Sequence, residues 1–299
     1  MPDSFNKNVI LITGASAGIG AALAKRLAEQ YSEIRLVLAS RNLEKLEAIA
    51  TQCRAAGAEV LVIPTDMAKT EQVVALAQKA LEHYGQVNVL VNNAGYGQMG
   101  PVELIPDSEA QQQFAVNVLA PIALTRALIP AMRDQGGGRI INVSSLGGRL
   151  AFPIGGLYSA SKFALEGLSD ALRMELEPFN IRVSVVEPGP VRTDFFGVAR
   201  QQTERLTTDP AKTPYRAALQ KLAGLEQQVN RQAWSSEQVA EVIIKALHDR
   251  HPKPRYIAAT GGRILLTLTK FLPTRLMDRF WQRFYGVDLV AADWRNSKN

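Results

Sequence analysis

The sequence contains few of the residues that build disulfide frameworks or metal sites. Its 299 residues include one cysteine, Cys53, and three histidines. A single cysteine cannot form an internal disulfide, which fits a reducing cytosol, and its apolar helical surroundings predict that it packs in the core. The histidines (His83, His248 and His251) form no ligand-spaced cluster with Cys53, so no metal site is expected.

Long apolar runs and a basic leader are also missing. No stretch approaches the roughly eighteen consecutive apolar residues that a membrane-spanning helix needs. The N-terminal segment MPDSFNKNVILITG lacks the basic start and apolar run of a signal peptide. The sequence therefore predicts a cytoplasmic protein without a spanning helix.

Charge of one sign is not in excess over most of the chain. Residues 1–250 carry 25 basic and 25 acidic side chains, whereas residues 251–285 carry seven basic side chains against Asp278 alone. The whole formal net charge of +6 thus lies in one C-terminal segment. A main body without excess positive charge argues against nucleic acid as a partner.

Short apolar runs alternate with segments of helical periodicity. We expect β-strands, each rich in Val, Ile or other apolar residues, at residues 8–14, 35–40, 59–66, 87–95, 138–145, 181–189 and 255–260. This alternation predicts a doubly wound α/β fold of Rossmann type, with a parallel seven-stranded sheet and helices on both faces.

Two regions depart from this alternation. Residues 190–232 form a long insertion in the domain that we expect over residues 1–260, and insertions of that length are typical of lids or binding segments. Residues 261–299 are predicted to be a C-terminal helical extension of the same domain.

A glycine-rich turn follows the first expected strand. In TGASAGIG (13–20), Gly14, Gly18 and Gly20 allow a tight turn and a close approach of backbone to a ligand. The following helix N-terminus offers free N–H groups to a pyrophosphate. The turn therefore predicts dinucleotide binding, although by itself it also fits a simple strand-to-helix connection.

Tyr158 and Lys162 lie four residues apart in LYSASKFALE, on one face of an expected helix. A phenol with a pKa of about 10 is a poor base at neutral pH. An ammonium about 4–5 Å away, at an effective dielectric of about 20, favours the phenolate by about 3–4 kcal/mol. The spacing thus predicts an acid/base pair in which the pKa of Tyr158 is lowered toward neutrality.

Five motifs occur together in a characteristic order. TGASAGIG is followed by NNAG (92–95), by the serine pair at 144–145, by Tyr158 and Lys162, and by PGPVRT (188–193). Over roughly residues 8–260 the chain resembles the classical short-chain dehydrogenase/reductase family. The resemblance implies an oxidoreductase acting on CH–OH groups, in which hydride passes between a nicotinamide cofactor and a carbonyl or alcohol.

The resemblance also implies roles for individual residues. Tyr158 would donate and accept the proton, Ser145 would hydrogen-bond the reacting oxygen, and Lys162 would hold the nicotinamide ribose. Asn117 would position a relay water, or alternatively bond a neighbouring strand. The residues implied to bind the cofactor are Gly14, Ser16, Gly18, Ile19, Gly20, Ser40, Arg41, Asp66, Met67, Asn93, Ala94, Gly95, Tyr158, Lys162, Pro188, Gly189, Val191 and Thr193. Asp66 has a second interpretation, as the N-cap of the next helix.

The end of the second strand indicates which nicotinamide is used. NAD enzymes of this architecture place an acidic residue there for the ribose 2′-hydroxyl, whereas this chain has Ser40 followed by Arg41. A guanidinium can hold a 2′-phosphate, each charged hydrogen bond contributing about 1.5–3 kcal/mol. We therefore expect NADP(H) and an NADP-binding catalytic domain over residues 1–260; the alternative is that Arg41 is a solvated surface charge.

The substrate is expected between residues 147–157 and the 190–232 insertion, which would act as a lid and contains Phe195 and Phe196. These segments suggest a lipophilic ketone, aldehyde or alcohol, unless the rings only pack the lid. A 3-oxoacyl-thioester reductase is an alternative within the family, although such enzymes usually end near the seventh strand. A non-catalytic NADP(H) sensor is disfavoured by the complete catalytic set. We expect a homodimer or homotetramer.

The segment TRLMDRFWQRFYG predicts an amphipathic helix over residues 274–286, after Pro273 and before a terminating glycine. Its large apolar side chains share one face, and Arg275, Arg279 and Arg283 flank that face. Two interpretations stay open. The face packs on the protein itself or on a partner subunit, or residues 274–285 make peripheral contact with a membrane interface.

Overall fold

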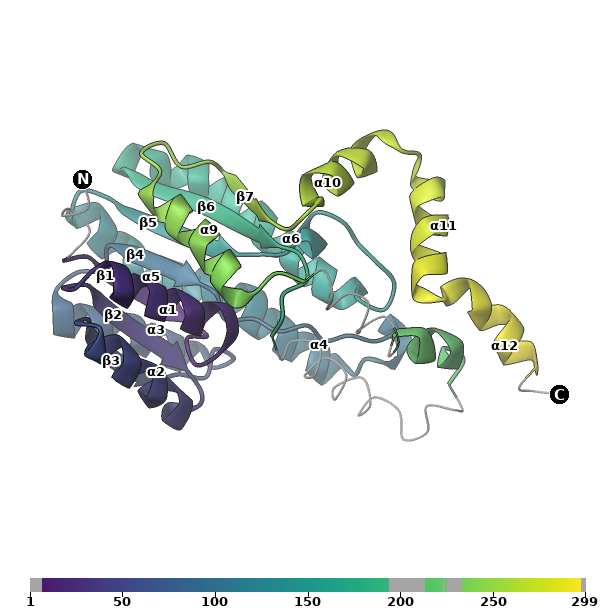
Figure 1. Ribbon diagram of the computed structural model, residues 1–299, viewed down its shortest axis with the longest axis horizontal. Coiled ribbons are helices and arrows are strands. Elements are labelled where there is room, and N and C mark those ends of the chain that lie inside the picture. Colours follow the sequence, from purple (N-terminus) through teal and green to yellow (C-terminus); the bar gives the residue numbers. More distant parts are fainter. Residues whose placement is uncertain (1–6, 194–212, 223, 225–232, 297–299) are drawn as a thin grey trace.

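The computed structural model describes residues 7–193, 213–222, 224 and 233–296 (Figure 1). Its centre is a seven-stranded sheet of order β3-β2-β1-β4-β5-β6-β7, in which all paired strands run parallel. The strands are β1 (Val9–Thr13), β2 (Arg35–Ser40), β3 (Glu59–Pro64), β4 (Val89–Asn92), β5 (Gly138–Val143), β6 (Ile181–Pro188) and β7 (Arg255–Ala258). The predicted doubly wound fold is confirmed, and every strand lies within its expected range.

Helices cover both faces of the sheet because successive strand residues point to opposite sides. Ile10 and Ile12 of β1 pack in one core with α1 (Gly18–Gln30), α2 (Leu43–Ala55) and α9 (Ser236–His248). Val9 and Leu11 pack in the other core with α3 (Thr70–Tyr84), α5 (Ala120–Asp134) and the end of α6 (Gly156–Leu176). Cys53 is fully buried in the first core, as predicted.

One helical stretch meets the length and composition of a membrane span. The helix α4 (Asp107–Phe114), the π-helical turn η3 (Ala115–Leu119) and α5 form a continuous run from Asp107 to Asp134, with a mean hydropathy of 1.6 over its most apolar window. Leu124, Leu128 and Met132 of this run are fully buried and pack toward the sheet. Burial in the core therefore accounts for part of the apolar composition, since 44% of that window is buried.

The chain continues after β7 as a helical arm. It consists of α10 (Gly262–Phe271), α11 (Thr274–Tyr285) and α12 (Val290–Asn296), and Figure 1 shows it projecting beyond the sheet. The predicted helix at 274–286 is present, and Gly286 ends it in the left-handed conformation with φ 72°. Short 3-10 turns complete the described elements: η2 (Val102–Leu104), η4 (Leu146–Gly148), η5 (Glu177–Phe179) and η7 (Val287–Leu289).

The described part of the 190–232 insertion contacts this arm. Arg216 pairs with Asp293 of α12, and Lys221 donates to the Arg283 carbonyl oxygen at the end of α11. Phe195 and Phe196, which we expected at the substrate site, lie outside the described residues. The action of the insertion as a lid therefore stays a prediction.

Candidate active site

The carboxyl ends of the central strands carry the predicted motifs, and Thr13 joins two of them. The Thr13 hydroxyl accepts the N–H groups of Asn93 and Ala94, each at 3.0 Å. The Asn93 amide returns a 2.8 Å hydrogen bond to the Thr13 carbonyl oxygen. These bonds fix the NNAG segment after β4 beside the glycine turn after β1.

The glycine turn leaves no space for side chains. Gly14 has φ 66°, and a Cβ there would lie 2.9 Å from the Ala94 Cα. A Cβ on Gly20 would lie 2.4 Å from the Gly14 carbonyl oxygen. Helix α1 begins here without a side-chain cap at Ala17 and without an acidic residue in its first turn. Free N–H groups at an uncapped helix start form a site for a pyrophosphate, so these residues fit a dinucleotide.

The PGPVRT loop approaches the same turn. A Cβ on Gly18 would lie 3.2 Å from the Thr193 methyl group, and Gly189 lies against Leu146 of the loop after β5. Val191 is buried and pairs with Trp234 as an isolated bridge. The loop predicted to hold the cofactor therefore lies between the glycine turn and the segment after Ser145.

The residues predicted to bind the adenosine half of the cofactor lie in different environments. Ser40 ends β2 with its hydroxyl buried and, among the described residues, without a hydrogen-bond partner, whereas the following Arg41 is exposed. The Asp66 carboxylate accepts the Ala68 N–H at 3.1 Å, and α3 has Lys69 at its N-cap position. The interpretation of Asp66 as the N-cap of that helix is therefore wrong. Its carboxylate accepts a hydrogen bond in the turn that precedes Lys69, and α3 has no side-chain cap.

Ser145 and Tyr158 lie together at the end of β5. Ser145 caps the turn η4, where its hydroxyl accepts the Gly147 N–H at 3.0 Å. Tyr158 lies in the first turn of α6 and is 8% exposed. Burial raises the pKa of the Tyr158 phenol to about 12, and a hydrogen bond with Ser145 acts in the opposite direction. The expectation of a lowered pKa is thus wrong for the cofactor-free protein, because desolvation of the phenolate is the larger effect.

Lys162 is buried one turn further along α6. Its ammonium donates to the Val143 carbonyl oxygen at 2.9 Å and lies 6.0 Å from the centre of the Tyr158 ring. Burial lowers the pKa of Lys162 to about 8, while the nearby Glu166 carboxylate acts to raise it. Tyr158 and Lys162 are therefore neighbours, as the spacing predicted, but each has its neutral form favoured by burial.

Asn117 lies in the π-helical turn η3 and faces the same space. Its amide nitrogen donates to the Tyr96 carbonyl oxygen at 2.9 Å and to the Ser161 hydroxyl at 3.0 Å. A Cβ on Gly95 would lie 3.2 Å from the Asn117 side-chain oxygen and 3.3 Å from the Lys162 nitrogen. A π-turn is frequent at functional sites, and this one turns Asn117 toward Lys162. The alternative also holds in part, since Asn117 bonds the chain just after β4.

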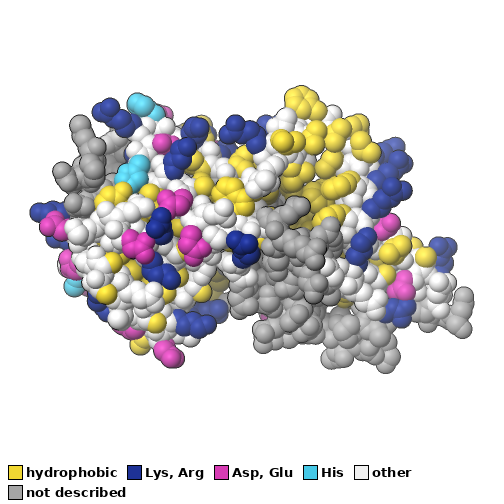
Figure 2. Space-filling view, viewed as in Figure 1, with side chains coloured by type: hydrophobic (Ala, Val, Ile, Leu, Met, Phe, Trp, Pro, Cys, Tyr) yellow, Lys and Arg dark blue, Asp and Glu magenta, His cyan; other side chains and the backbone are white. Residues whose placement is uncertain are grey.

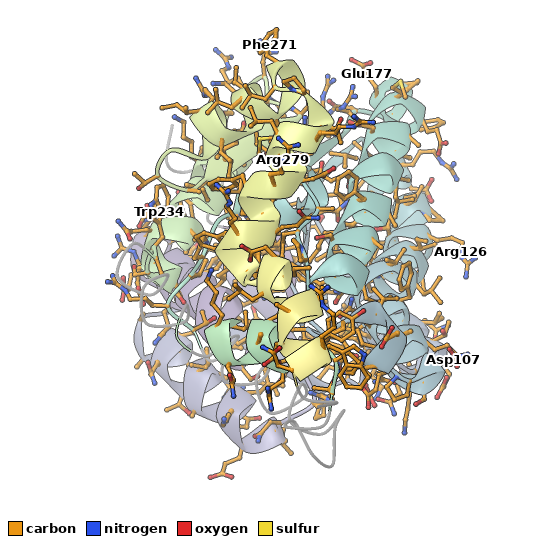
Figure 3. The ribbon with its side chains drawn as sticks, turned by 90° about the vertical axis from the view of Figure 1, so that its right-hand side faces the viewer. Asp107, Arg126, Glu177, Trp234, Phe271 and Arg279 are labelled. Carbon is orange, nitrogen blue, oxygen red and sulfur yellow. The ribbon has the colours of Figure 1, made fainter. Side chains whose placement is uncertain are left out.

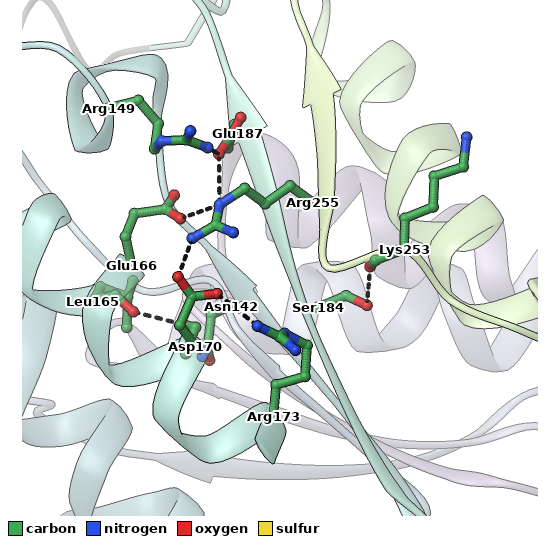
Figure 4. Close-up of polar contacts among 11 residues, drawn as sticks. Asn142, Arg149, Leu165, Glu166, Asp170, Arg173, Ser184, Glu187, Lys253 and Arg255 are labelled. Carbon is green, nitrogen blue, oxygen red and sulfur yellow. Dashed lines mark hydrogen bonds and ion pairs between the residues drawn. The ribbon is translucent and has the colours of Figure 1, made fainter. Parts of the chain in front are cut away.

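A partly buried ion network supports α6, the helix that carries Tyr158 and Lys162 (Figure 4). Arg255 of β7 donates to Glu166 at 3.0 Å and to Asp170 at 2.6 Å, both on α6. It also lies 3.3 Å from Glu187 of β6, which accepts from Arg149 at 2.9 Å. These bonds join α6, two strands and the loop after Ser145. Sequence reasoning missed this network, because its members share no motif.

Aromatic rings pack beside Tyr158. Phe152 packs on Met99 and Tyr158, and its ring stacks on Tyr285 of α11 with centroids 5.5 Å apart. Ile154 has φ 66°, a strained conformation for a β-branched residue, and its carbonyl oxygen accepts the Gly100 N–H at 2.7 Å. The predicted 147–157 loop is thus held between Tyr158 and the C-terminal arm.

A cavity of about 290 Å³ lies beside this loop. One wall is formed by Arg149, Leu150 and Ala151, and the other by α10 and α11, including Leu266, Met277 and Trp281. Tyr285 was also missed by sequence reasoning, although it extends the apolar arc of the predicted amphipathic helix.

Comparisons with known proteins agree with this geometry. The family described as short chain dehydrogenase matches residues 8–204. The human 17-beta-hydroxysteroid dehydrogenase type 1 is 35% identical over 265 residues, covering 87% of this chain and 79% of that protein. The ketoacyl reductase HetN from Nostoc sp. is 33% identical over 283 residues, covering 93% and 90%.

Two solved structures are similar throughout the fold. A short chain dehydrogenase/reductase from Burkholderia phymatum in complex with NAD has a TM-score of 0.78 and 31% identity, covering 88% of this chain and 93% of that one. A metagenomic short-chain oxidoreductase in complex with NADP has a TM-score of 0.66 and 32% identity, covering 84% and 96%.

Proposed function

Because the chain belongs to the short-chain dehydrogenase family, we propose that it is an NADP(H)-dependent oxidoreductase that interconverts a carbonyl and an alcohol on a lipophilic small molecule. The observation that carries this proposal is the meeting of Ser145, Tyr158 and Lys162 beside the glycine turn. A binding module or NADP(H) sensor would not need a buried phenol and a buried ammonium at this point.

The residues of the chain account for the proton half of the reaction. A bound nicotinamide supplies or accepts the hydride. Tyr158, with its pKa raised to about 12, is protonated at neutral pH, which is the form that donates a proton to a carbonyl oxygen. Ser145 orients that oxygen by a hydrogen bond, and Lys162 is held toward the cofactor side by the Val143 carbonyl oxygen. In the oxidation direction the same phenol must first lose its proton before it can accept one from the alcohol.

The preference for NADP(H) rests on the end of β2. Ser40 places no carboxylate there to repel a 2′-phosphate, and the exposed Arg41 beside it can pair with one. Similar solved structures hold NAD in one case and NADP in another, so fold alone does not select between them. Measured kcat/KM with NADPH should exceed that with NADH about 10- to 100-fold.

The lipophilic substrate class is supported by the walls of the site. Phe152, Met99 and Tyr285 present apolar surface next to Tyr158, and the adjoining cavity continues toward α10 and α11. The named hydroxysteroid dehydrogenase is one similar protein. A panel of steroid ketones, long-chain aldehydes and small ketones, followed by the absorbance of NADPH, tests the class directly.

A 3-oxoacyl-thioester reductase is the second candidate, because the ketoacyl reductase HetN aligns over 93% of this chain. Against it, this chain continues past β7 into the C-terminal arm, whose Tyr285 stacks on Phe152, whereas the sequence-based expectation for such reductases is an end near the seventh strand. Acetoacetyl thioester belongs in the same panel. A higher kcat/KM for that thioester than for any steroid ketone or long-chain aldehyde would favour the second candidate.

The proposal also covers assembly and location. We place the enzyme in the cytoplasm as a homodimer or homotetramer, which sedimentation measurements would test. For helix α11, peripheral membrane contact and a subunit interface are the two alternatives that its exposed apolar side chains support.

A further inference from the structure

The outer side of α10 and α11 carries an exposed apolar surface. On α10 it contains Ile264, Leu268 and Phe271, which are 67%, 46% and 80% exposed and follow one another at helical spacing. On α11 it contains Leu276 and Phe280, which are 50% and 51% exposed. These five residues define the C-terminal apolar surface. Figure 2 shows apolar side chains gathered over α10 and the adjoining part of α11.

Packing among the residues that the structure describes does not account for this surface. On the inner side of α11, Met277 and Trp281 line the cavity and Tyr285 stacks on Phe152. Those side chains satisfy the contact between the arm and the catalytic domain. Leu276 and Phe280 lie beyond that contact, and exposed apolar residues that cluster in this way mark an interaction site.

A row of arginines borders the apolar surface. Arg275, Arg279 and Arg283 are exposed and follow at four-residue steps along α11, and Figure 3 shows Arg279 on the outer side of that helix. Among the described residues, none of the three has a carboxylate within ion-pair distance. In Figure 2, basic side chains lie along the edge of the apolar patch.

We propose that the C-terminal apolar surface docks on the anionic surface of a lipid bilayer, with α10 and α11 lying in the interface. Large apolar side chains beside a row of cations match the two components of such a surface, the acyl boundary and the anionic headgroups. Residues 262–285, which form both helices, carry five basic side chains against Asp278 alone, whereas Arg255 just before them is already paired with acidic side chains of the catalytic domain.

A second copy of the chain is the poorer occupant. In a two-fold dimer both copies bring the same surface to the interface, so the three bordering arginines of each copy would gather in one place and repel one another. Anionic headgroups instead neutralise every arginine. Charge complementarity therefore selects the lipid surface.

Docking at this surface would also bring the cavity close to the lipid, from which a lipophilic substrate could enter. This step rests on the proposed function. The cavity lies on the inner side of the same two helices, against Leu150 and Ala151. A lipophilic substrate dissolved in the bilayer would leave the lipid at the edge of this cavity. Docking itself does not depend on turnover, so the two proposals can fail separately.

The test is flotation of the full-length protein with vesicles of phosphatidylglycerol and phosphatidylcholine, and with phosphatidylcholine vesicles alone, at low and high salt. One variant, Ile264→Ser with Phe271→Ser, removes the two most exposed side chains of the C-terminal apolar surface. Its matched control, Leu119→Ser with Met174→Ser, removes residues that are 54% and 62% exposed elsewhere. NADPH binding in each variant reports that the catalytic domain is folded.

A second pair of variants tests the charges. Changing Arg275, Arg279 and Arg283 to Gln should weaken anionic-vesicle binding about 5-fold for each arginine and roughly 100-fold together. The control replaces three exposed cations outside the arm, Lys45, Lys79 and Arg126, by Gln. The expected result is salt-sensitive binding to anionic vesicles that both arm variants reduce and both controls retain.

Three outcomes would overturn the proposal. The first is the lack of binding to anionic vesicles at low salt. The second is binding that the arm variants leave unchanged. The third is a concentration-dependent dimer in sedimentation that Ile264→Ser with Phe271→Ser dissociates, since that result assigns the surface to a second copy.

Discussion

The edge of the sheet that carries the glycine turn, which we call the nucleotide edge, differs from the C-terminal arm in how tightly it is packed. Around the glycine turn, backbone atoms approach so closely that a single Cβ at Gly14 or Gly20 would collide with them. In α11, by contrast, no side chain is fully buried. In the functions proposed above, the first region holds reacting groups in place by tight packing, whereas the second presents its surface to a lipid bilayer. Substitutions in the two regions should therefore change different measurements.

Phe152 joins the two regions. It packs on Tyr158 and stacks on Tyr285, so its ring links the arm to the tyrosine that we propose as the acid/base. A comparison of variants on the two sides of Phe152 therefore separates effects on chemistry from effects on substrate access.

The largest expected effect is that of Tyr158→Phe. The ring and its packing stay, and only the transferable proton is lost, so turnover should fall roughly 10²- to 10⁴-fold. The dissociation constant for NADPH, measured by fluorescence titration, should change less than about 3-fold, because the glycine turn is untouched. Turnover above a few per cent of wild type would contradict the acid/base role of Tyr158.

Lys162→Met should increase the stability of the cofactor-free protein while it destroys activity. The pKa of Lys162 is lowered from 10.5 to about 8 in the folded protein, so between those values the unfolded chain binds more protons. Wild-type stability should therefore rise as pH rises through about 8 to 10.5. At neutral pH the variant should be more stable by up to about 3 kcal/mol.

The control for that prediction is the pH dependence itself. Denaturant unfolding of both proteins at several pH values gives the difference in free energy of unfolding. This difference should shrink as pH rises from about 8 to 10.5, where Lys162 of wild type is deprotonated in the folded state but still protonated in the unfolded chain. A difference independent of pH would mean that burial does not hold the pKa of Lys162 down.

The cofactor preference should change about 10- to 100-fold. Replacing Ser40 with Asp and Arg41 with Ser introduces a carboxylate at the end of β2 and removes the cation there. The ratio of kcat/KM for NADPH and NADH should move toward NADH, and turnover at saturating NADH should stay near that of wild type. Equal use of both cofactors by the wild type would mean that Arg41 is only a surface charge.

Much of the nucleotide edge could be predicted, because the residues of each of its motifs are close together in the sequence. The glycine turn, the order of the strands' closing residues and the Tyr158–Lys162 spacing each lie within one short segment. The pKa of Tyr158 could not be predicted, since it depends on burial by the loop that contains Phe152.

The support of the site could not be predicted for a related reason. Arg255 and Glu166 are 89 positions apart, and they meet only through the pairing of β6 with β7 and the rotation of α6 about its axis. The amphipathic pattern of α11 was visible in the sequence, but not which part of its apolar arc faces inward. The structure divides that arc, with Trp281 at the cavity and Phe280 half exposed.

The smallest expected effect tests the contact between arm and site. Tyr285→Ala removes the ring that stacks on Phe152, and an aromatic pair contributes about 0.5–1.5 kcal/mol. The KM for a lipophilic ketone should therefore rise about 3- to 10-fold, with kcat and NADPH affinity nearly unchanged, since Ser145, Tyr158 and Lys162 stay in place.

Tyr285→Phe is the matched control, because it keeps the ring and should behave as wild type. A small ketone that does not reach the arm should show the same KM in all three proteins. If Tyr285→Ala leaves the KM of the lipophilic ketone unchanged, the arm does not wall the substrate site; if it lowers kcat for both ketones, the arm acts on Tyr158 through Phe152.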